Sequence, residues 1–190
     1  LGRISDLHRA QHAGHRADRH EPRLVVVIER LGRRRQRLLV GDRQVGRSES
    51  PDLRKFSEPE VVFFRDELDP WNSDHYNPCV VKYPLDADAY LMFPSAYYHY
   101  PEAVRRNDGP LDIQLATSRD GIEWTRLDRR PYVGLGVDGS FDDSMLCMTV
   151  GMLQKEDELW MYYSGYTYTH GNVDTSIKKR GVSSRLVPRV

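Results

Sequence analysis

The stretch "SRDGIEW", residues 118–124, decides the fold, because a closely similar phrase, "SPDLRKF", stands at residues 50–56. The Asp-Gly pair is a strong hairpin signal, since glycine adopts a positive φ at little cost. Serine, aspartate and an aromatic residue recur in one order, 68 residues apart: Ser50, Asp52 and Phe56, then Ser118, Asp120 and Trp124. The repetition predicts two copies of one strand–turn–strand unit. The alternative is that two unrelated hairpins share common turn residues.

Short apolar segments surround both turns. They are rich in β-branched and aromatic residues, Asp, Gly, Asn and Pro separate them, and no window keeps a helical period. In chain order they read "EPEVVFF", "PCVVKY", "AYLMFPSAYY", "LDIQLATS", "MLCMTVGML" and "ELWMYYSGYTY". We therefore predict an all-β domain.

The repeat extends beyond the turns. Residues 89–100 match residues 159–170 at an offset of 69, and residues 73–81 match residues 141–149 at an offset of 68. The second match gives Asp74 the place of Asp142, and Cys79 the place of Cys147. Each unit then holds about four strands, as in a β-propeller blade, whose core is completed by neighbouring blades. We predict repeat units at about 45–113 and 114–182, within a domain spanning residues 45–190.

The N-terminal segment, residues 1–44, differs from the rest of the chain. It is rich in arginine, and all aromatic residues lie at Phe56 or later. Without apolar surface to bury, such a segment does not offset its ordering entropy, so we predict that it is disordered or weakly attached. Leu24–Ile28 and Leu38–Val40 could still form a hairpin around an arginine-rich turn. The alternatives are a solvated edge, a phosphate-binding or nucleic-acid-binding run, or a sequence that is not native.

The composition limits the partners and cofactors. Lys plus Arg and Asp plus Glu number 28 each, so no net field attracts nucleic acid or an anionic membrane. No apolar run is long enough to span a bilayer or to form a signal peptide, which predicts a soluble protein, cytoplasmic by default. Two cysteines provide neither a disulfide framework nor a zinc site. We expect no cofactor and no metal.

The two turns carry a family resemblance. "SPDLRKF" and "SRDGIEW" resemble the S-x-D-L/G-x-x-W/F blade signature of the five-bladed β-propeller glycosidases, the superfamily of glycoside hydrolase families 32, 43 and 68. "NPCVVKYPLDADAYLMFPSAYY" is similar to their apolar innermost strand followed by an aromatic strand. The resemblance covers residues 45 to about 170. It implies about two four-stranded antiparallel blades of a partial propeller, since five blades of this period need roughly 300 residues.

The resemblance also implies catalytic carboxylates around a central pocket. Glycoside hydrolysis requires two carboxyl groups in different environments, because one donates a proton while the other stays ionised. Asp142 occupies the place of the family's modulator aspartate, as pKa modulator or transition-state stabiliser, and Asp74 has the same repeat position one blade earlier. The alternative is that Asp142 and Asp143 accept turn hydrogen bonds after Gly139. We find no general-acid glutamate at a matching position.

Aromatic and histidine residues at the ends of equivalent strands could line a carbohydrate subsite. The candidates are His75, Tyr97, His99, Trp124, Tyr166 and His170. Trp124 has a simpler interpretation as packing between layers, and a metal bound by His99 and His170 is a weaker alternative.

The sequence therefore predicts a glycoside hydrolase-like protein that acts on or binds carbohydrate and is incomplete for catalysis as this chain. The alternatives are a non-catalytic carbohydrate-binding or interaction propeller, and a nucleic-acid-binding module that uses the arginine-rich segment. Open blade faces also predict self-association.

Overall fold

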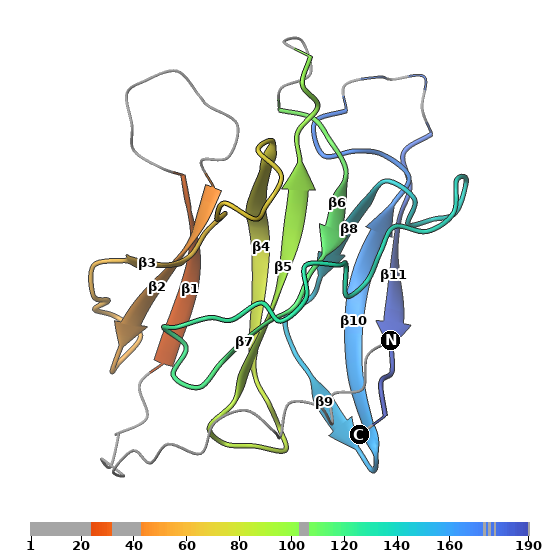
Figure 1. Cartoon of the computed structure of the whole chain (residues 1–190). Helices are drawn as coiled ribbons and strands as arrows, with labels where there is room; N and C mark the ends of the chain where they lie inside the picture. The colour runs from red at the N-terminus through yellow and green to blue at the C-terminus, as the bar shows by residue number, and fades with distance from the viewer. Residues whose placement is uncertain are drawn as a thin grey trace.

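The computed structural model describes residues 24–31, 43–102, 107–172, 174, 176 and 178–189, with side chains described from residue 43 onward. The described residues form strands joined by turns and loops, without a helix among them (Figure 1). The strands are β1 (Leu24–Leu31), β2 (Arg43–Ser50), β3 (Glu60–Phe63), β4 (Ser73–Lys82), β5 (Tyr90–Tyr98), β6 (Leu111–Ile113), β7 (Ala116–Ser118), β8 (Met145–Met148), β9 (Leu153–Lys155), β10 (Glu158–Tyr166) and β11 (Gly181–Leu186). The predicted all-β class is confirmed. None of the described residues forms a helix long and apolar enough to span a membrane.

The strands make two sheets. One has the order β1-β2-β3, and the other runs β11-β10-β8-β6-β5-β4, with β7 also paired to β5 and β9 to β10. All described pairings are antiparallel except that of β6 with β8, which is a single parallel pair, Leu111 with Met145. The larger sheet is thus two antiparallel groups, β4–β7 and β8–β11, joined at one point. With β1–β3 they form three groups in chain order across Figure 1.

The group β4–β7 is the central layer, and it contributes to two cores. Successive side chains of a strand point to opposite faces, so the neighbours Met92 and Phe93 of β5 pack into different clusters. Met92 packs with Val45 and Phe63 of the β1–β3 sheet. Phe93 packs in a cluster that contains Leu146 of β8. A layer covered on both faces explains why every residue from Leu91 to Tyr97 is buried.

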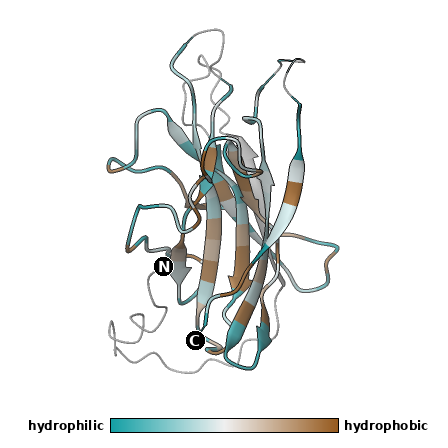
Figure 2. Ribbon diagram, turned by 90° about the vertical axis from the view of Figure 1, so that its right-hand side faces the viewer, coloured by the Kyte–Doolittle hydropathy of each residue, from teal (hydrophilic) through white to brown (hydrophobic). Residues whose placement is uncertain are grey.

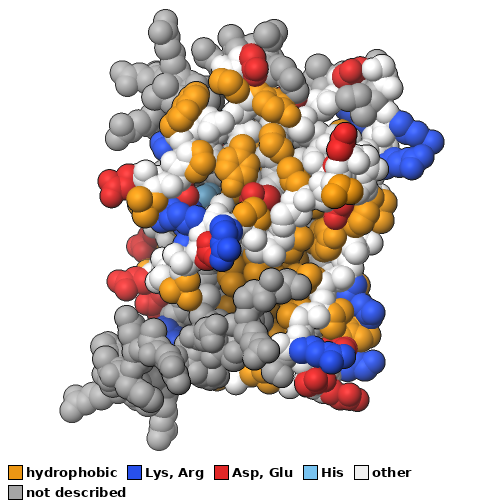
Figure 3. Space-filling model, turned by 45° about the vertical axis from the view of Figure 1, so that its right-hand side comes forward, with side chains coloured by type: hydrophobic (Ala, Val, Ile, Leu, Met, Phe, Trp, Pro, Cys, Tyr) orange, Lys and Arg blue, Asp and Glu red, His pale blue; other side chains and the backbone are white. Residues whose placement is uncertain are grey.

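The group β8–β11 is covered less completely. In β10 buried residues alternate with more exposed ones, the pattern of a strand with one covered face. Figure 2 shows the hydrophobic bands along these strands. Val137, Val150 and Val182 are exposed, and Figure 3 shows hydrophobic patches between charged side chains on one side of the molecule. Self-association through such faces stays a prediction.

The two repeated turns have the same local structure. In the second, Asp120 Oδ1 accepts hydrogen bonds from the backbone N–H groups of Ile122 and Glu123 at 2.8 and 2.9 Å. In the first, Asp52 Oδ1 accepts equivalent bonds of 2.9 and 3.0 Å, donated by Arg54 and Lys55. Leu53 (φ 62°) and Gly121 (φ 72°) both have the left-handed conformation. The sequence match thus corresponds to one turn geometry, whereas the superposition of units 45–113 and 114–182 stays a prediction.

The strand β1 lies inside the segment predicted to be weakly attached. It pairs with β2 over its whole length, from Leu24 opposite Ser50 to Leu31 opposite Arg43. The β-branched run Val25–Ile28 accounts for this strand. Leu38–Val40, the partner that we predicted, and residues 1–23 lie outside the described residues.

Candidate functional site

Buried polar and aromatic side chains gather where β4 begins and β5 ends, at the upper end of the central layer in Figure 1. We call this group the Asp74 cluster. Its members are Arg43, Asp74, Tyr76, Tyr97, His99 and His170. Asp74 and Tyr97 are opposite one another in the antiparallel register of β4 and β5. Arg43 comes from β2 and His170 from the loop after β10, so all three layers contribute.

The Asp74 carboxylate is at the centre of the cluster and is 2% exposed. Its Oδ2 accepts a hydrogen bond from Arg43 Nη1 at 3.2 Å and lies 2.9 Å from His99 Nε2. Its Oδ1 is buried and has no hydrogen-bond partner. A carboxylate removed from water needs a compensating positive charge, which the guanidinium of Arg43 supplies.

Aromatic rings form the wall of the cluster. The Tyr97 ring is fully buried, with its centroid 4.0 Å from that of His99 and 5.1 Å from that of His170. The guanidinium of Arg43 lies over the rings of Tyr97 and Tyr76, at 5.0 and 5.3 Å from their centroids. Burial raises the pKa of Tyr97 above its ordinary value, so the phenol stays protonated. Burial and the charge of Arg43 lower the pKa of His170, which favours a neutral imidazole at pH 7.

Three buried polar atoms of the cluster have no hydrogen-bond partner: Asp74 Oδ1, Tyr97 Oη and His170 Nδ1. More than nine-tenths of buried polar groups in native proteins are paired, and each unpaired group costs about 1–3 kcal/mol. The three atoms come from β4, β5 and the loop after β10, and they offer an acceptor, a hydroxyl and an imidazole nitrogen. This set can bind hydroxyl groups of a ligand.

A second buried carboxylate, Asp108, lies at the same end of the layer and is 7% exposed. Its Oδ1 accepts hydrogen bonds from the backbone N–H groups of Gly109 and Gly171, at 2.8 and 3.0 Å. Its charge acts on Tyr97 and His170, raising the pKa of the first and opposing the decrease in that of the second. Two buried carboxylates at one end of a layer are a feature that acid–base chemistry requires.

The cluster unites several residues that the sequence had singled out. Asp74, Tyr97, His99 and His170 are members. Tyr166 packs at the same end, against the small hydrophobic core that contains Tyr97. Sequence reasoning missed Arg43, Tyr76 and Asp108. Arg43 follows a run of similar arginines, and Asp108 lies in a stretch that reads as an ordinary loop, so neither had a distinguishing signal.

Asp142 lies elsewhere, in a turn three residues before β8. Its Oδ1 accepts a hydrogen bond from Ser140 Oγ at 2.8 Å, and its Oδ2 accepts one from Tyr163 Oη at 3.0 Å. Its backbone carbonyl accepts from Gly136 N at 3.0 Å. Tyr166 of β10 is opposite Met145, whereas the equivalent Tyr97 of β5 is opposite Asp74. Asp142 therefore does not lie at the start of a strand as Asp74 does. These contacts correspond to the turn alternative that the sequence left open.

His75 and Trp124 lie on the opposite face of the central layer. His75 follows Asp74 in β4 and therefore points the other way, where its ring lies 4.7 Å from that of Phe63. Trp124 packs against the core shared with the β1–β3 sheet, as its packing interpretation predicted. Neither side chain contributes to the Asp74 cluster.

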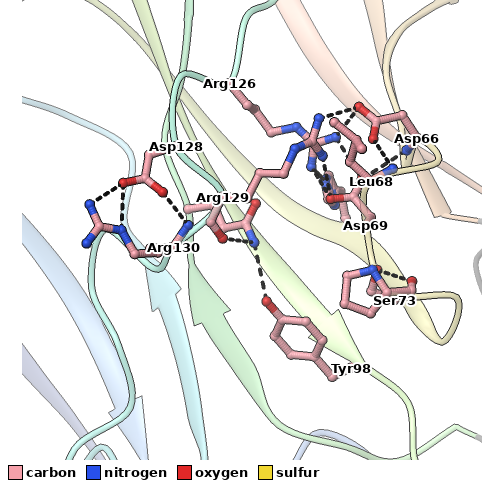
Figure 4. Close-up of polar contacts among 12 residues, drawn as sticks. Asp66, Leu68, Asp69, Ser73, Tyr98, Arg126, Asp128, Arg129 and Arg130 are labelled. Atoms are coloured by element: carbon pink, nitrogen blue, oxygen red, sulfur yellow. Dashed lines mark hydrogen bonds and ion pairs between the residues drawn. The ribbon is translucent and has the colours of Figure 1, made fainter.

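A network of ion pairs covers His75, and we call it the Arg126 network (Figure 4). Arg126 donates to both oxygens of Asp69 at 2.7 Å and to Asp66 Oδ2 at 2.8 Å, while Arg129 donates to the same two carboxylates. Arg126 Nη1 also lies 2.8 Å from His75 Nε2. Burial and the charge of Arg126 lower the pKa of His75 to about 4. Since arginine only donates, Nε2 accepts and the imidazole proton is on Nδ1.

The described residues contain no group of three His, Cys, Asp or Glu side chains arranged to hold a metal ion. The cysteines Cys79 and Cys147 are free, and burial raises the pKa of the Cys79 thiol to about 11.

No family model matches the chain. A curated relative, the A type blood N-acetyl-alpha-D-galactosamine deacetylase of Flavonifractor plautii, is 31% identical over 77 residues, which is 40% of this chain and 8% of that protein. The chain therefore spans a small part of that relative's length.

Three solved structures are similar in fold. An N-acetylgalactosamine deacetylase from F. plautii in complex with blood group B trisaccharide matches with a TM-score of 0.52 and 19% identity, over 76% of this chain and 37% of that one. A glycosyl hydrolase from Bacteroides ovatus matches with a TM-score of 0.51 and 18% identity, over 79% and 42% of the two chains. A protein described as a glycoside hydrolase matches with a TM-score of 0.51 and 16% identity, over 88% and 42%. The likeness is one of fold, and this chain spans less than half of each of these three proteins.

Proposed function

We propose that the chain is part of a β-propeller of the glycoside hydrolase type and that its Asp74 cluster binds carbohydrate. The single observation that carries this proposal is the set of unpaired buried atoms on Asp74, Tyr97 and His170. Sugar hydroxyl groups both donate and accept hydrogen bonds, and buried tyrosine and histidine rings provide apolar surface for a sugar ring. Such a combination of apolar wall and few convergent polar groups is typical of small-molecule sites.

The propeller assignment rests on the layers and turns. Three antiparallel groups follow one another in chain order, and the central one packs against both neighbours. Packing of consecutive antiparallel units face to face is the arrangement of propeller blades. The proteins with similar folds are named as glycoside hydrolases and a deacetylase, and one of them was solved with a blood group trisaccharide. Membership of families 43, 32 or 68 and a total of five blades are parts of this proposal.

Within the site, Asp74 replaces Asp142 as the carboxylate to which we assign a role. Asp74 Oδ1 accepts from a sugar hydroxyl, while Arg43 and His99 hold Oδ2 in place. Tyr97 and His170 contribute one hydrogen bond each. Asp108 is the second carboxylate, and its Oδ1 accepts hydrogen bonds from two backbone N–H groups.

Binding is the part of this function that we assign to the chain alone. General acid catalysis contributes roughly 10²–10⁴-fold, and it requires a carboxyl group kept protonated opposite an ionised one. The sequence offers no general-acid glutamate at a matching position, and both Asp74 and Asp108 accept hydrogen bonds from protein donors. We therefore expect carbohydrate binding without turnover of aryl arabinofuranoside, xyloside or fructoside substrates at an enzyme-like rate.

The test is calorimetric titration of the purified chain with blood group B trisaccharide, the ligand of a structurally similar protein. Asp74→Asn and Tyr97→Phe should each weaken binding at least tenfold, because each removes one hydrogen-bonding atom and little volume. Two exposed positions provide matched controls, Asp157→Asn and Tyr162→Phe, and these should bind like the wild type.

If this trisaccharide fails, the same titration is repeated with the three aryl glycosides. Absence of binding to all four compounds, or equal affinities in the Asp74 and Asp157 variants, would refute the proposed site. Turnover that Asp74→Asn abolishes would keep the site and overturn our expectation that this chain lacks catalysis.

A further inference from the structure

A second group of buried polar side chains lies on the opposite face of β5 from the Asp74 cluster. Its members are Tyr98 of β5, Asp112 of β6 and Gln114, which follows β6. Asp112 is opposite Ala96 of β5, and His75 of β4 is opposite the same alanine on its other side. Ala96 is thus flanked on this face by the polar residues Asp112 and His75.

The phenol of Tyr98 fixes how the other two side chains are oriented. Tyr98 Oη donates to Asp112 Oδ2 at 3.2 Å and accepts from Gln114 Nε2 at 3.3 Å. Gln114 Nε2 also donates to the backbone carbonyl of Arg129 at 3.4 Å. Because the amide nitrogen faces these two acceptors, the amide oxygen faces away from them.

Two acceptor atoms are consequently left without partners, Asp112 Oδ1 and Gln114 Oε1. Their residues are only 7% and 3% exposed. Burial raises the pKa of Asp112 to about 6, as expected for a carboxyl group without a neighbouring cation to stabilise its charge. Both side chains bond the same Tyr98 hydroxyl, so the two unpaired acceptors belong to one small group and together require two donors.

Among the described residues, the two arginines that adjoin this group do not fill this role. Arg126 and Arg129 direct their terminal nitrogens to Asp66 and Asp69 in the Arg126 network (Figure 4). Asp66 and Asp69 balance the charges of these two arginines, so the network adds no net charge beside Asp112 and Gln114. Arg129 connects the pair to the surface, since its carbonyl accepts from Gln114 and its side chain is 29% exposed.

We propose that Asp112 and Gln114 form a second carbohydrate site, in which Asp112 Oδ1 and Gln114 Oε1 accept hydrogen bonds from two adjacent hydroxyl groups of a sugar. A vicinal diol presents two donors on neighbouring carbon atoms, which meets the requirement for two donors. The site does not depend on the Asp74 cluster, because Tyr97 and Tyr98 point to opposite faces of β5.

The experiment is a titration of the ¹⁵N-labelled full chain followed by NMR, with the Gln114 side-chain amide and the backbone amides of Ala96 and Tyr98 as reporters. The probes are cis-1,2-cyclohexanediol and methyl α-D-mannopyranoside, each with a cis diol, beside cyclohexanol and ammonium chloride. We expect saturable shifts with the two diols and at least tenfold weaker effects with cyclohexanol, which lacks one donor.

Two variants test the acceptors separately. Asp112→Asn keeps an oxygen for Tyr98 and places an amide donor where the ligand donates, and Gln114→Met removes the amide oxygen at similar volume. Each should weaken diol binding at least tenfold. The exposed pair Asp157→Asn and Gln154→Met provides the same chemical changes away from the site and should have no effect.

Several results would overturn the proposal: no saturable shift with either diol, equal shifts with cyclohexanol, saturation by ammonium instead, or unchanged binding in both variants. A crystal structure of the chain soaked with the mannoside that shows only water bridging the two acceptors would also overturn it. Asp74→Asn should leave the shifts at Ala96 unchanged, so that failure at the Asp74 cluster and failure here are distinguishable. If Asp112→Asn does not fold, Gln114→Met and the four probes still decide whether the two acceptors bind a diol.

Discussion

Removal of the guanidinium at Arg126 should destabilise the protein strongly. Its side chain is 4% exposed, and it donates to both oxygens of Asp69, which is 3% exposed. Removing one partner of a buried pair costs about 3–5 kcal/mol, because the remaining charge is left without compensation. Arg129 still donates to Asp69 Oδ1 at 2.8 Å, so we expect about 3 kcal/mol for Arg126→Met. For a chain of this length that loss lowers Tm by about 6–12 °C.

The assay is urea unfolding at pH 7 monitored by circular dichroism, together with a thermal scan. Arg130→Met is the control, because Arg130 pairs with Asp128 at the surface, where its side chain is 87% exposed and the pair contributes little. Combining Arg126→Met with Asp69→Asn should recover part of the loss, since no buried charge is then left unpaired. Equal midpoints for the Arg126 and Arg130 variants would refute the reasoning, because they would mean that the Arg126 pair is exposed to water in solution.

Further predictions concern pH, packing and reactivity. The folded pKa of Asp112 is about 6, which is above its unfolded value, so this group stabilises the fold at low pH. On the order of 3 kcal/mol of the free energy of unfolding is lost as pH rises from about 4 to 6. Asp112→Asn should remove that slope in urea midpoints. The pKa of His75 is lowered to about 4, so its contribution to stability depends on pH in the opposite direction and is lost as pH falls from about 6.5 to 4. His75→Gln should reduce this dependence of the urea midpoint on pH. Gly165→Ala should cost about 1–3 kcal/mol in the same assay, since an added Cβ would lie 2.5 Å from Asp142 Cβ. Cys79 is buried and its pKa is raised, so it should react with a thiol reagent such as dithionitrobenzoate only at the rate of unfolding. Fast labelling of Cys79 at pH 8 would contradict its burial.

The strands and turns could be predicted from the sequence because their signals are local. Asp120 bonds the backbone amides of Ile122 and Glu123 within one short segment, and the same segment at Asp52 could be recognised by its sequence. The central position of β5 was less visible. A run such as "YLMFPSAYY" has no alternation, since both of its faces are covered, and coverage depends on strands far away in the chain.

The carboxylates show why a constant repeat offset was insufficient for the site. The register of β4 against β5 shifts between Tyr76 and Cys79, and Asn77 in this interval has a φ of 45°. Such a bulge adds one residue to one strand, so no single sequence offset can describe the pairing on both sides of it. Ser95 of β5 is opposite Tyr76, whereas its match Ser164 of β10 is opposite Cys147, so Cys147 does not take the place of Cys79 in the pairing, and Asp142 lies in a turn.

Other parts of the site depend on tertiary contacts. Arg43 reaches Asp74 from another sheet, and Asp108 joins the site through a backbone contact with Gly171. Neither pairing has a sequence signature. Asp112 could not be recognised from the sequence either, because its environment depends on burial and on the Tyr98 hydroxyl, which only the folded chain defines.

The shared central layer has a consequence for the order in which the protein opens. Met92 and Phe93 are consecutive in β5 yet belong to separate cores, so either outer layer can detach while the other core remains packed. Native-state hydrogen exchange should then divide the amides into cooperative units, with those of β2 and β10 exchanging through separate partial openings and those of β5 only when both have opened. Since the three units follow one another in chain order and the middle one packs against both others, unfolding should proceed from either end toward the middle, as in linear repeat arrays.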